Sequence, residues 1–128
     1  MIETGQGLEA AARAARHAAF ERTLAPGELL VTAHHRDDQA ETVLLRLLRG
    51  AGDGLAAMRP LRPFAHGWLW RPLLDLPRET LHASAREHAL HWLEDPSNES
   101  DRHDRNFLRL HVMPRLSERW QHAGQALA

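Results

Sequence analysis

Two imidazoles and three carboxylates lie within nine residues, in the run HHRDDQAET that begins at residue 34. They belong to His34, His35, Asp37, Asp38 and Glu41. Carboxylates bind hard cations and ammonium groups, and imidazole exchanges protons near neutral pH. The composition of this run therefore indicates a catalytic or ligand-binding site.

Helix capping is the structural alternative for two of the acids. Asp38 followed three residues later by Glu41 fits a capping box with Asp38 as the cap. Capping does not account for the two histidines and the third acid, so we favour a functional role, which one residue can combine with capping. A zinc or iron site is a weaker interpretation, because the run has no cysteine and no second histidine one helical turn along.

The elements around this run predict where it lies. Residues 28–33, ELLVTA, form an apolar segment behind Pro26-Gly27 and predict a buried parallel strand. A helix should follow and end at Gly50, with one buried face: Ala40, Val43, Leu44, Leu47 and Leu48. The polar run would then sit at the carboxyl edge of an open α/β sheet, where such folds bind ligands.

The remaining elements are expected on both sides of this region in the sequence. They are a helix over 8–24, an extended segment over 60–72 with Trp68 and Trp70 alternating, a helix over 78–91 and a helix over 104–120 that Pro114 kinks near Leu110. The expected buried stripes of the three helices are Leu8, Ala12, Ala15, Ala19 and Phe20; Leu81, Ala85, Ala89 and Trp92; and Phe107, Leu110, Met113 and Leu116. Gly50, Gly52 and Gly54 predict either a helix end with a turn or a close backbone approach to phosphate.

A second polar group lies near the start of the last helix. Arg105, Asn106 and Arg109 lie within about one turn, beside Arg102, and could form a small anion cradle or a solvated face. The chain as a whole is nearly neutral, with 16 basic residues, all arginine, against 17 acidic ones. Any nucleic-acid contact must therefore come from a local patch.

The bulk composition bounds the remaining possibilities. The 128 residues have room for one modest domain, and the absence of cysteine excludes disulfides and thiolate-bound metal within them. No signal peptide or membrane span is visible, so we expect a soluble, cytoplasmic protein without a membrane partner.

Four segments in one order resemble tRNA(Ile)-lysidine synthetase, from about Gly7 to about Arg119: GLEAAARAARHAAF, HHRDDQAETVLLRLLRGAGDGLAAM, RPLLDLPRETL and HWLEDPSNESDRHDRNFLRLHVMPRL. That family belongs to the ATP pyrophosphatase group. The resemblance implies an α/β fold, part of an adenine-nucleotide-hydrolase-like (Rossmann-like) open sheet with flanking helices. It also implies a reaction in which ATP adenylates the wobble cytidine of tRNA(Ile) and free lysine displaces AMP to form lysidine.

The resemblance also implies roles for the polar residues. Asp38 and Glu41 would handle lysine and magnesium, and His34, His35 and Asp37 would contact the nucleotide or the target base. Arg105, Asn106 and Arg109 would contact phosphate or tRNA. ATP and magnesium are the expected cofactors, and a carboxylate with a tuned pKa could serve as the base for the lysine amine.

One departure and two rival interpretations remain open. The family's nucleotide loop, SGGxDS, does not occur in these 128 residues. We therefore expect residues 1–128 to be the distal part of the N-terminal catalytic domain, with no second domain, and to be inactive alone. The rivals are a two-thiocytidine synthetase, which the lack of cysteine disfavours, and a non-catalytic RNA-binding remnant.

Overall fold

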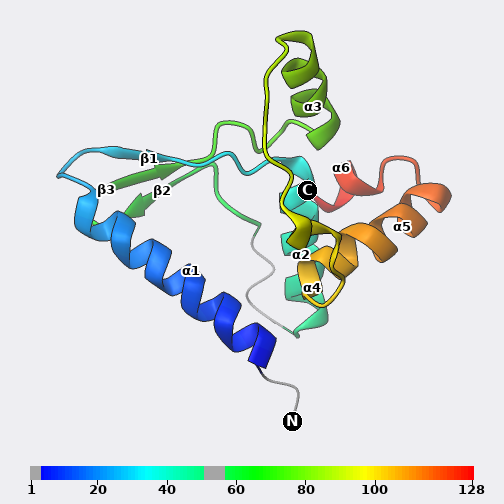
Figure 1. The fold of residues 1–128 in the computed structure, drawn as a ribbon, viewed down its shortest axis with the longest axis horizontal. Helices are drawn as coiled ribbons and strands as arrows, with labels where there is room; N and C mark the ends of the chain where they lie inside the picture. Colours follow the sequence, from blue (N-terminus) through cyan, green and yellow to red (C-terminus); the bar gives the residue numbers. More distant parts are fainter. Residues whose placement is uncertain (1–3, 51–56) are drawn as a thin grey trace. The chain divides into compact units, whose positions relative to one another are not determined.

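The computed structural model describes residues 4–50 and 57–128 (Figure 1). The chain forms two compact units, one of Met1–Ala33 with Arg59–Pro72 and one of His34–Met58 with Leu73–Ala128. Of the predicted glycine corner, Gly52 and Gly54 lie outside the described residues. Gly50 has a φ of 71° directly after the second helix, as expected of a glycine that ends a helix.

The first unit contains a three-stranded sheet and one long helix. The strands are β1 (Leu29–Val31), β2 (Leu61–Phe64) and β3 (Gly67–Trp70), in the order β1-β3-β2. β1 is parallel to β3 and β2 is antiparallel to it, so the predicted parallel strand and the predicted extended segment are both confirmed. Together with the helices of both units, this sheet confirms the expected α/β class.

Gly67 allows β3 to approach the start of β1. A Cβ atom at Gly67 would lie 2.1 Å from the backbone oxygen of Glu28, which accepts a hydrogen bond from the Trp68 amide at 3.0 Å. A side chain at this position would push the two strands apart. The tight pairing therefore depends on glycine.

Burial in the sheet differs from the prediction. Leu69 is 3% exposed and Phe64 is buried, but Leu29 and Val31 of β1 are exposed. Side chains alternate between the faces of a sheet, and the register places Leu29 and Val31 opposite Trp68 and Trp70 on the face away from Leu69. The prediction of a fully buried strand was therefore wrong, because only one face of this strand is covered by described residues.

The helix of the first unit is α1 (Thr4–Thr23). It confirms the predicted helix, but Leu8 of the expected inward stripe is 75% exposed, and Ala12 and Ala15 are exposed too. A 20-residue helix is about 30 Å long, whereas a four-residue strand spans about 13 Å, so the helix extends beyond the sheet. In the part of the chain that is described, none of the helices combines the length and apolar character needed to cross a membrane.

The second unit is helical. Its elements are α2 (Arg36–Leu48), α3 (Arg78–Glu87), the 3-10 helix η1 (Pro96–Glu99), α4 (Asp104–Phe107), the π-helix η2 (Leu108–Val112), α5 (Met113–Arg119) and α6 (Ala123–Leu127). α2 packs against α6 and α4, and the small core includes Ala40, Leu74, Leu108 and Ala123. α2 thus lies at the centre of this unit.

The face that α2 buries is not the predicted one. Its buried residues are Gln39, Ala40, Glu41 and Thr42, whereas Leu47 and Leu48 are exposed. Polar side chains in the first half of α2 have partners: Gln39 binds the Met58 backbone, and Thr42 accepts a hydrogen bond from Arg105 of α4. The predicted apolar stripe therefore holds at Ala40, is half-buried at Val43 and Leu44, and fails in the last turn.

The later helices differ in extent and burial. α3 ends at Glu87 rather than residue 91, Ala89 adopts a left-handed φ of 50°, and Leu81 and Ala85 are only partly covered, while Ala89 and Trp92 are exposed. The predicted last helix is interrupted by η2, ahead of Pro114, which has no amide hydrogen to continue an α-helical ladder. Leu108 is buried, whereas Phe107 and Leu110 are exposed, contrary to the prediction.

Candidate functional site

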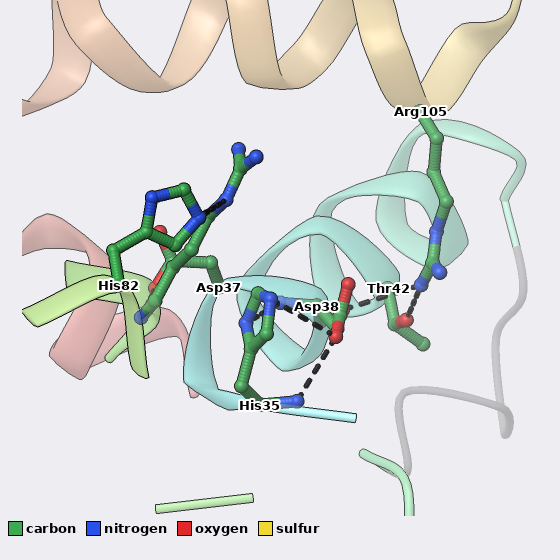
Figure 2. Close-up of polar contacts among 7 residues, drawn as sticks. His35, Asp37, Asp38, Thr42, His82 and Arg105 are labelled. Carbon is green, nitrogen blue, oxygen red and sulfur yellow. Dashed lines mark hydrogen bonds and ion pairs between the residues drawn. The ribbon is translucent and has the colours of Figure 1, made fainter. Parts of the chain in front are cut away.

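The site begins where α2 starts, and its first feature is a reciprocal cap (Figure 2). The Asp38 carboxylate accepts a hydrogen bond from the His35 amide at 2.9 Å, and the Asp38 amide donates to His35 Nδ1 at 3.4 Å. His35 is therefore the N-cap and Asp38 the third helical residue. The predicted box of Asp38 with Glu41 is wrong, because the helix starts earlier and Glu41 lies beyond its first turn.

The cap determines which ring nitrogen carries the proton in the neutral form of His35. Nδ1 accepts a hydrogen bond, so the ring proton of the neutral form lies on Nε2, which is 3.5 Å from Asp38 Oδ2. The His35 amide nitrogen and His35 Nε2 both contact the same carboxylate oxygen, Asp38 Oδ2. His35 thus orients the Asp38 carboxylate and leaves the Oδ1 atom as the one with no part in the cap.

Asp37 points to a different helix from its neighbour. Its Oδ1 atom accepts a hydrogen bond from the Arg78 amide at 3.0 Å, at the first residue of α3. The N-cap residue of α3 is Pro77, whose side chain cannot accept this hydrogen bond, so Asp37 supplies the missing acceptor from α2. Arg36 strengthens the same connection by donating to the Asp75 carbonyl at 2.8 Å.

Glu41 is the buried acid of the site. It is 3% exposed, and burial raises its pKa to about 7. Arg105 is the strongest opposing influence and lowers the pKa, Asp38 raises it, and Arg109 and Asp37 act in the same senses more weakly. Glu41 is therefore divided between its neutral and ionised forms near neutral pH, where it can accept or donate a proton.

Arg105 connects α4 to α2 beside this acid. Its guanidinium donates to the Asp38 carbonyl at 3.2 Å and to the Thr42 hydroxyl, as Figure 2 shows. Arg49 and Asp104 form a second connection between these segments, an exposed ion pair at 3.0 Å. The cation is thus held close to both Asp38 and Glu41.

Asn106 and Arg109 hold the turn formed by η1. Asn106 donates to the Ser97 carbonyl at 2.9 Å, and Arg109 donates to the Asn98 carbonyl and to Asn106 Oδ1, each at 2.8 Å. Their polar atoms therefore bind protein oxygens at least in part. Arg102, expected beside them, is exposed on the preceding loop.

The structure thus brings together only part of the predicted set. Asp38, Glu41 and Arg105 form one group. Asp37 instead accepts a hydrogen bond from the first residue of α3, and His34 is half-buried ahead of the cap. Two residues were missed by the sequence analysis: Thr42, which binds Arg105, and Gln39. The Gln39 amide forms two hydrogen bonds with the Met58 backbone, at 2.9 Å and 2.8 Å. The available signal for both was their position in the first half of an amphipathic helix, within two residues of Ala40.

The described residues do not form a complete metal site by themselves. No group of three or more histidine, aspartate or glutamate side chains converges within residues 4–50 and 57–128. Magnesium often binds one or two carboxylates together with substrate phosphates, and Asp38 with Glu41 can supply no more than that.

Comparison with known proteins gives consistent matches. A family model described as a PP-loop domain matches residues 1–116. The tRNA(Ile)-lysidine synthase of Xanthomonas campestris pv. campestris (strain 8004) is 64% identical over 127 residues, which cover 98% of this chain and 29% of that protein. Proteins of the same name from Xylella fastidiosa (strain Temecula1 / ATCC 700964) and Proteus mirabilis (strain HI4320) are 62% and 56% identical, over 98% and 94% of this chain. The chain spans less than a third of the length of these relatives: 29% of the Xylella protein and 28% of the Proteus protein.

Proposed function

Since this chain belongs to the PP-loop domain family, we propose that it forms part of the catalytic domain of an enzyme that makes lysidine on tRNA(Ile). In the proposed reaction, ATP adenylates the wobble cytidine and the side-chain amine of free lysine displaces AMP. Residues 1–128 would be the distal part of that domain. The identity of 55% or more to proteins named tRNA(Ile)-lysidine synthase supports this assignment.

The observation that carries the proposal is the placement of Glu41. A carboxyl group buried beside Asp38 and Arg105, with a pKa of about 7, is suited to receive a proton from an amine. Free lysine arrives as an ammonium ion and must lose one proton before its nitrogen can attack. Ionised Glu41 would accept that proton, and Asp38 would bind the ammonium group before the transfer.

The other polar residues would act around this pair. His34, His35 and Asp37 are proposed to contact or frame the nucleotide or target base, His35 and Asp37 through the cap and the α2–α3 connection described above. Arg105, Asn106 and Arg109 are proposed to meet phosphate or tRNA. Arg105 and Arg109 lower the pKa of Glu41, which supports a position within the site rather than on a remote face.

ATP and tRNA(Ile) are the proposed substrates alongside free lysine, and the proposed location is the cytoplasm. Magnesium would arrive with the ATP phosphates and balance the charge of the pyrophosphate leaving group. Asp38, with Glu41, is the part of this chain that could bind it.

Carboxylate-to-amide substitutions in the full-length protein test the proposal. Asp38→Asn and Glu41→Gln keep the shape of each side chain but remove its charge. We expect lysidine formation, measured with labelled lysine and tRNA(Ile), to fall about a hundredfold or more in each variant. Glu79→Gln, an exposed carboxylate on α3, is the matched control and should retain activity. Normal turnover in both site variants would refute the assignment.

A further inference from the structure

The first unit carries a group of basic side chains around Phe64, which we call the Phe64 cluster: Arg13, Arg16, His17 and Arg62. The His17 ring meets the Phe64 ring edge to face, with ring centres 5.8 Å apart. The Arg62 guanidinium lies over the same ring, 5.4 Å from its centre. Phe64 therefore fixes two members of the cluster, one from α1 and one from β2.

The other two members lie next to His17 on α1. Positions 13, 16 and 17 fall on one side of a helix, and the side chains of Arg13 and Arg16 are exposed. Arg62 is half-buried and lies on the sheet face that also carries Leu69. α1 and β2 thus present three guanidinium groups from two elements of the same unit.

The electrostatics of His17 show that all three arginines lie close enough to act on its ring. Burial lowers the pKa of His17, and Arg13, Arg62 and Arg16 lower it further, while Glu21 raises it. His17 is therefore neutral at pH 7, and the arginines carry the charge of the cluster. Three like charges around one imidazole disfavour each other, and a bound anion would remove that cost.

The charge is uneven between the two units. The first unit has six arginines against four carboxylates, whereas the second has ten against thirteen. A polyanion would be attracted to the first unit, although the chain as a whole is nearly neutral. Guanidinium groups bind phosphate in pairs of parallel hydrogen bonds, which matches the exclusive use of arginine here.

We propose that the Phe64 cluster is a binding surface for the phosphate backbone of tRNA, separate from the residues assigned to chemistry. The choice of RNA as the polyanion rests on the proposed function. The surface itself rests on the convergence of Arg13, Arg16 and Arg62 about Phe64 and His17. Such contacts hold and orient the RNA without reading its sequence.

Binding of tRNA across a salt series tests this surface in the full-length protein. The variant Arg13→Ala/Arg16→Ala/Arg62→Ala should weaken binding and reduce the slope of log K against log salt by about two to three, because each lost phosphate contact removes about 0.7 to 0.9. The corresponding triple lysine variant keeps the charges and should keep most of the slope. Arg22→Ala, on the opposite side of α1, is the matched control and should leave the slope unchanged.

The outcomes separate the surface from the chemistry. An unchanged slope in the triple alanine variant, with tRNA still bound, would overturn the surface and leave the proposed function intact. Equal loss in the lysine variant would also overturn it, because a phosphate contact depends on charge. Vesicles with phosphatidylserine serve as a second probe, and a slope that depends on the cluster for vesicles but not for tRNA would refute RNA as the partner. Lysidine formation by the wild-type full-length protein is measured in parallel. If that protein binds tRNA through the cluster but forms no lysidine, the result would count against the proposed function and not against the surface.

Discussion

Replacing Glu41 with glutamine should stabilise the folded chain at high pH and leave it unchanged at low pH. Burial raises the pKa of this carboxyl from its ordinary value of 4.5 to about 7. Between these two values the folded protein retains a proton that the unfolded chain has lost. As pH rises through this range, ionisation therefore favours the unfolded chain increasingly over the folded one.

The size of the effect follows from the two pKa values. Their difference, at about 1.4 kcal/mol for each pKa unit, corresponds to about 3 kcal/mol. The penalty is nearly absent at pH 4, where both states are largely protonated, and nearly complete at pH 8. Glutamine cannot ionise, so Glu41→Gln should gain about 3 kcal/mol over the wild type at pH 8 and close to nothing at pH 4, provided that its amide fits the same space.

Urea unfolding of both proteins at several pH values between 4 and 8 measures this difference. Glu79→Gln is the control, since that carboxylate is exposed and its ion pair with Arg86 contributes at most about 1 kcal/mol, so the substitution should change the free energy of unfolding by no more than this between pH 4 and pH 8. A constant difference between wild type and Glu41→Gln would refute the reasoning. It would mean that Glu41 ionises as easily in the folded chain as in the unfolded one.

Two further substitutions test how the structure is held together. Asp37→Ala should lower the free energy of unfolding by about 1 to 2 kcal/mol, because it removes the acceptor for the Arg78 amide, whereas Asp37→Asn should restore most of it; equal losses in urea unfolding would contradict the capping role. Gly67→Ala should cost more than about 3 kcal/mol, because its Cβ would lie 2.1 Å from the Glu28 oxygen; a near-normal melting temperature by circular dichroism would show that β1 and β3 are not so closely paired.

Local patterns predicted most of the elements. The helical segment of α1, the punctuation of Pro26-Gly27 and the stop at Gly50 each depend on a few neighbouring residues, and the structure confirms all three, although not the predicted inward stripe of α1. Burial was less predictable, because it depends on which elements cover a face. For this reason the apolar side chain of Leu48 is exposed, whereas the ionisable side chain of Glu41 is buried.

The candidate site was predictable in position but not in its internal contacts. The run at the start of α2 was correctly identified as a concentrated polar group, and Arg105 was named independently from its own helix. The partner of Asp37 is 41 residues away, and no local pattern connects the two. The helix start was misplaced because histidine is an uncommon N-cap, and the more usual Asp38 drew the prediction instead.

The paired hydrogen bonds between Gln39 and Met58 have a consequence for how this region can evolve. The side-chain amide imitates a neighbouring peptide group, so the backbone at Met58 is held by α2 itself. Both bonds are needed to hold that peptide group, because one uses the amide as a donor and the other uses it as an acceptor. Exchange of Gln39 for a residue that lacks either a donor or an acceptor should therefore not be tolerated among homologous genes.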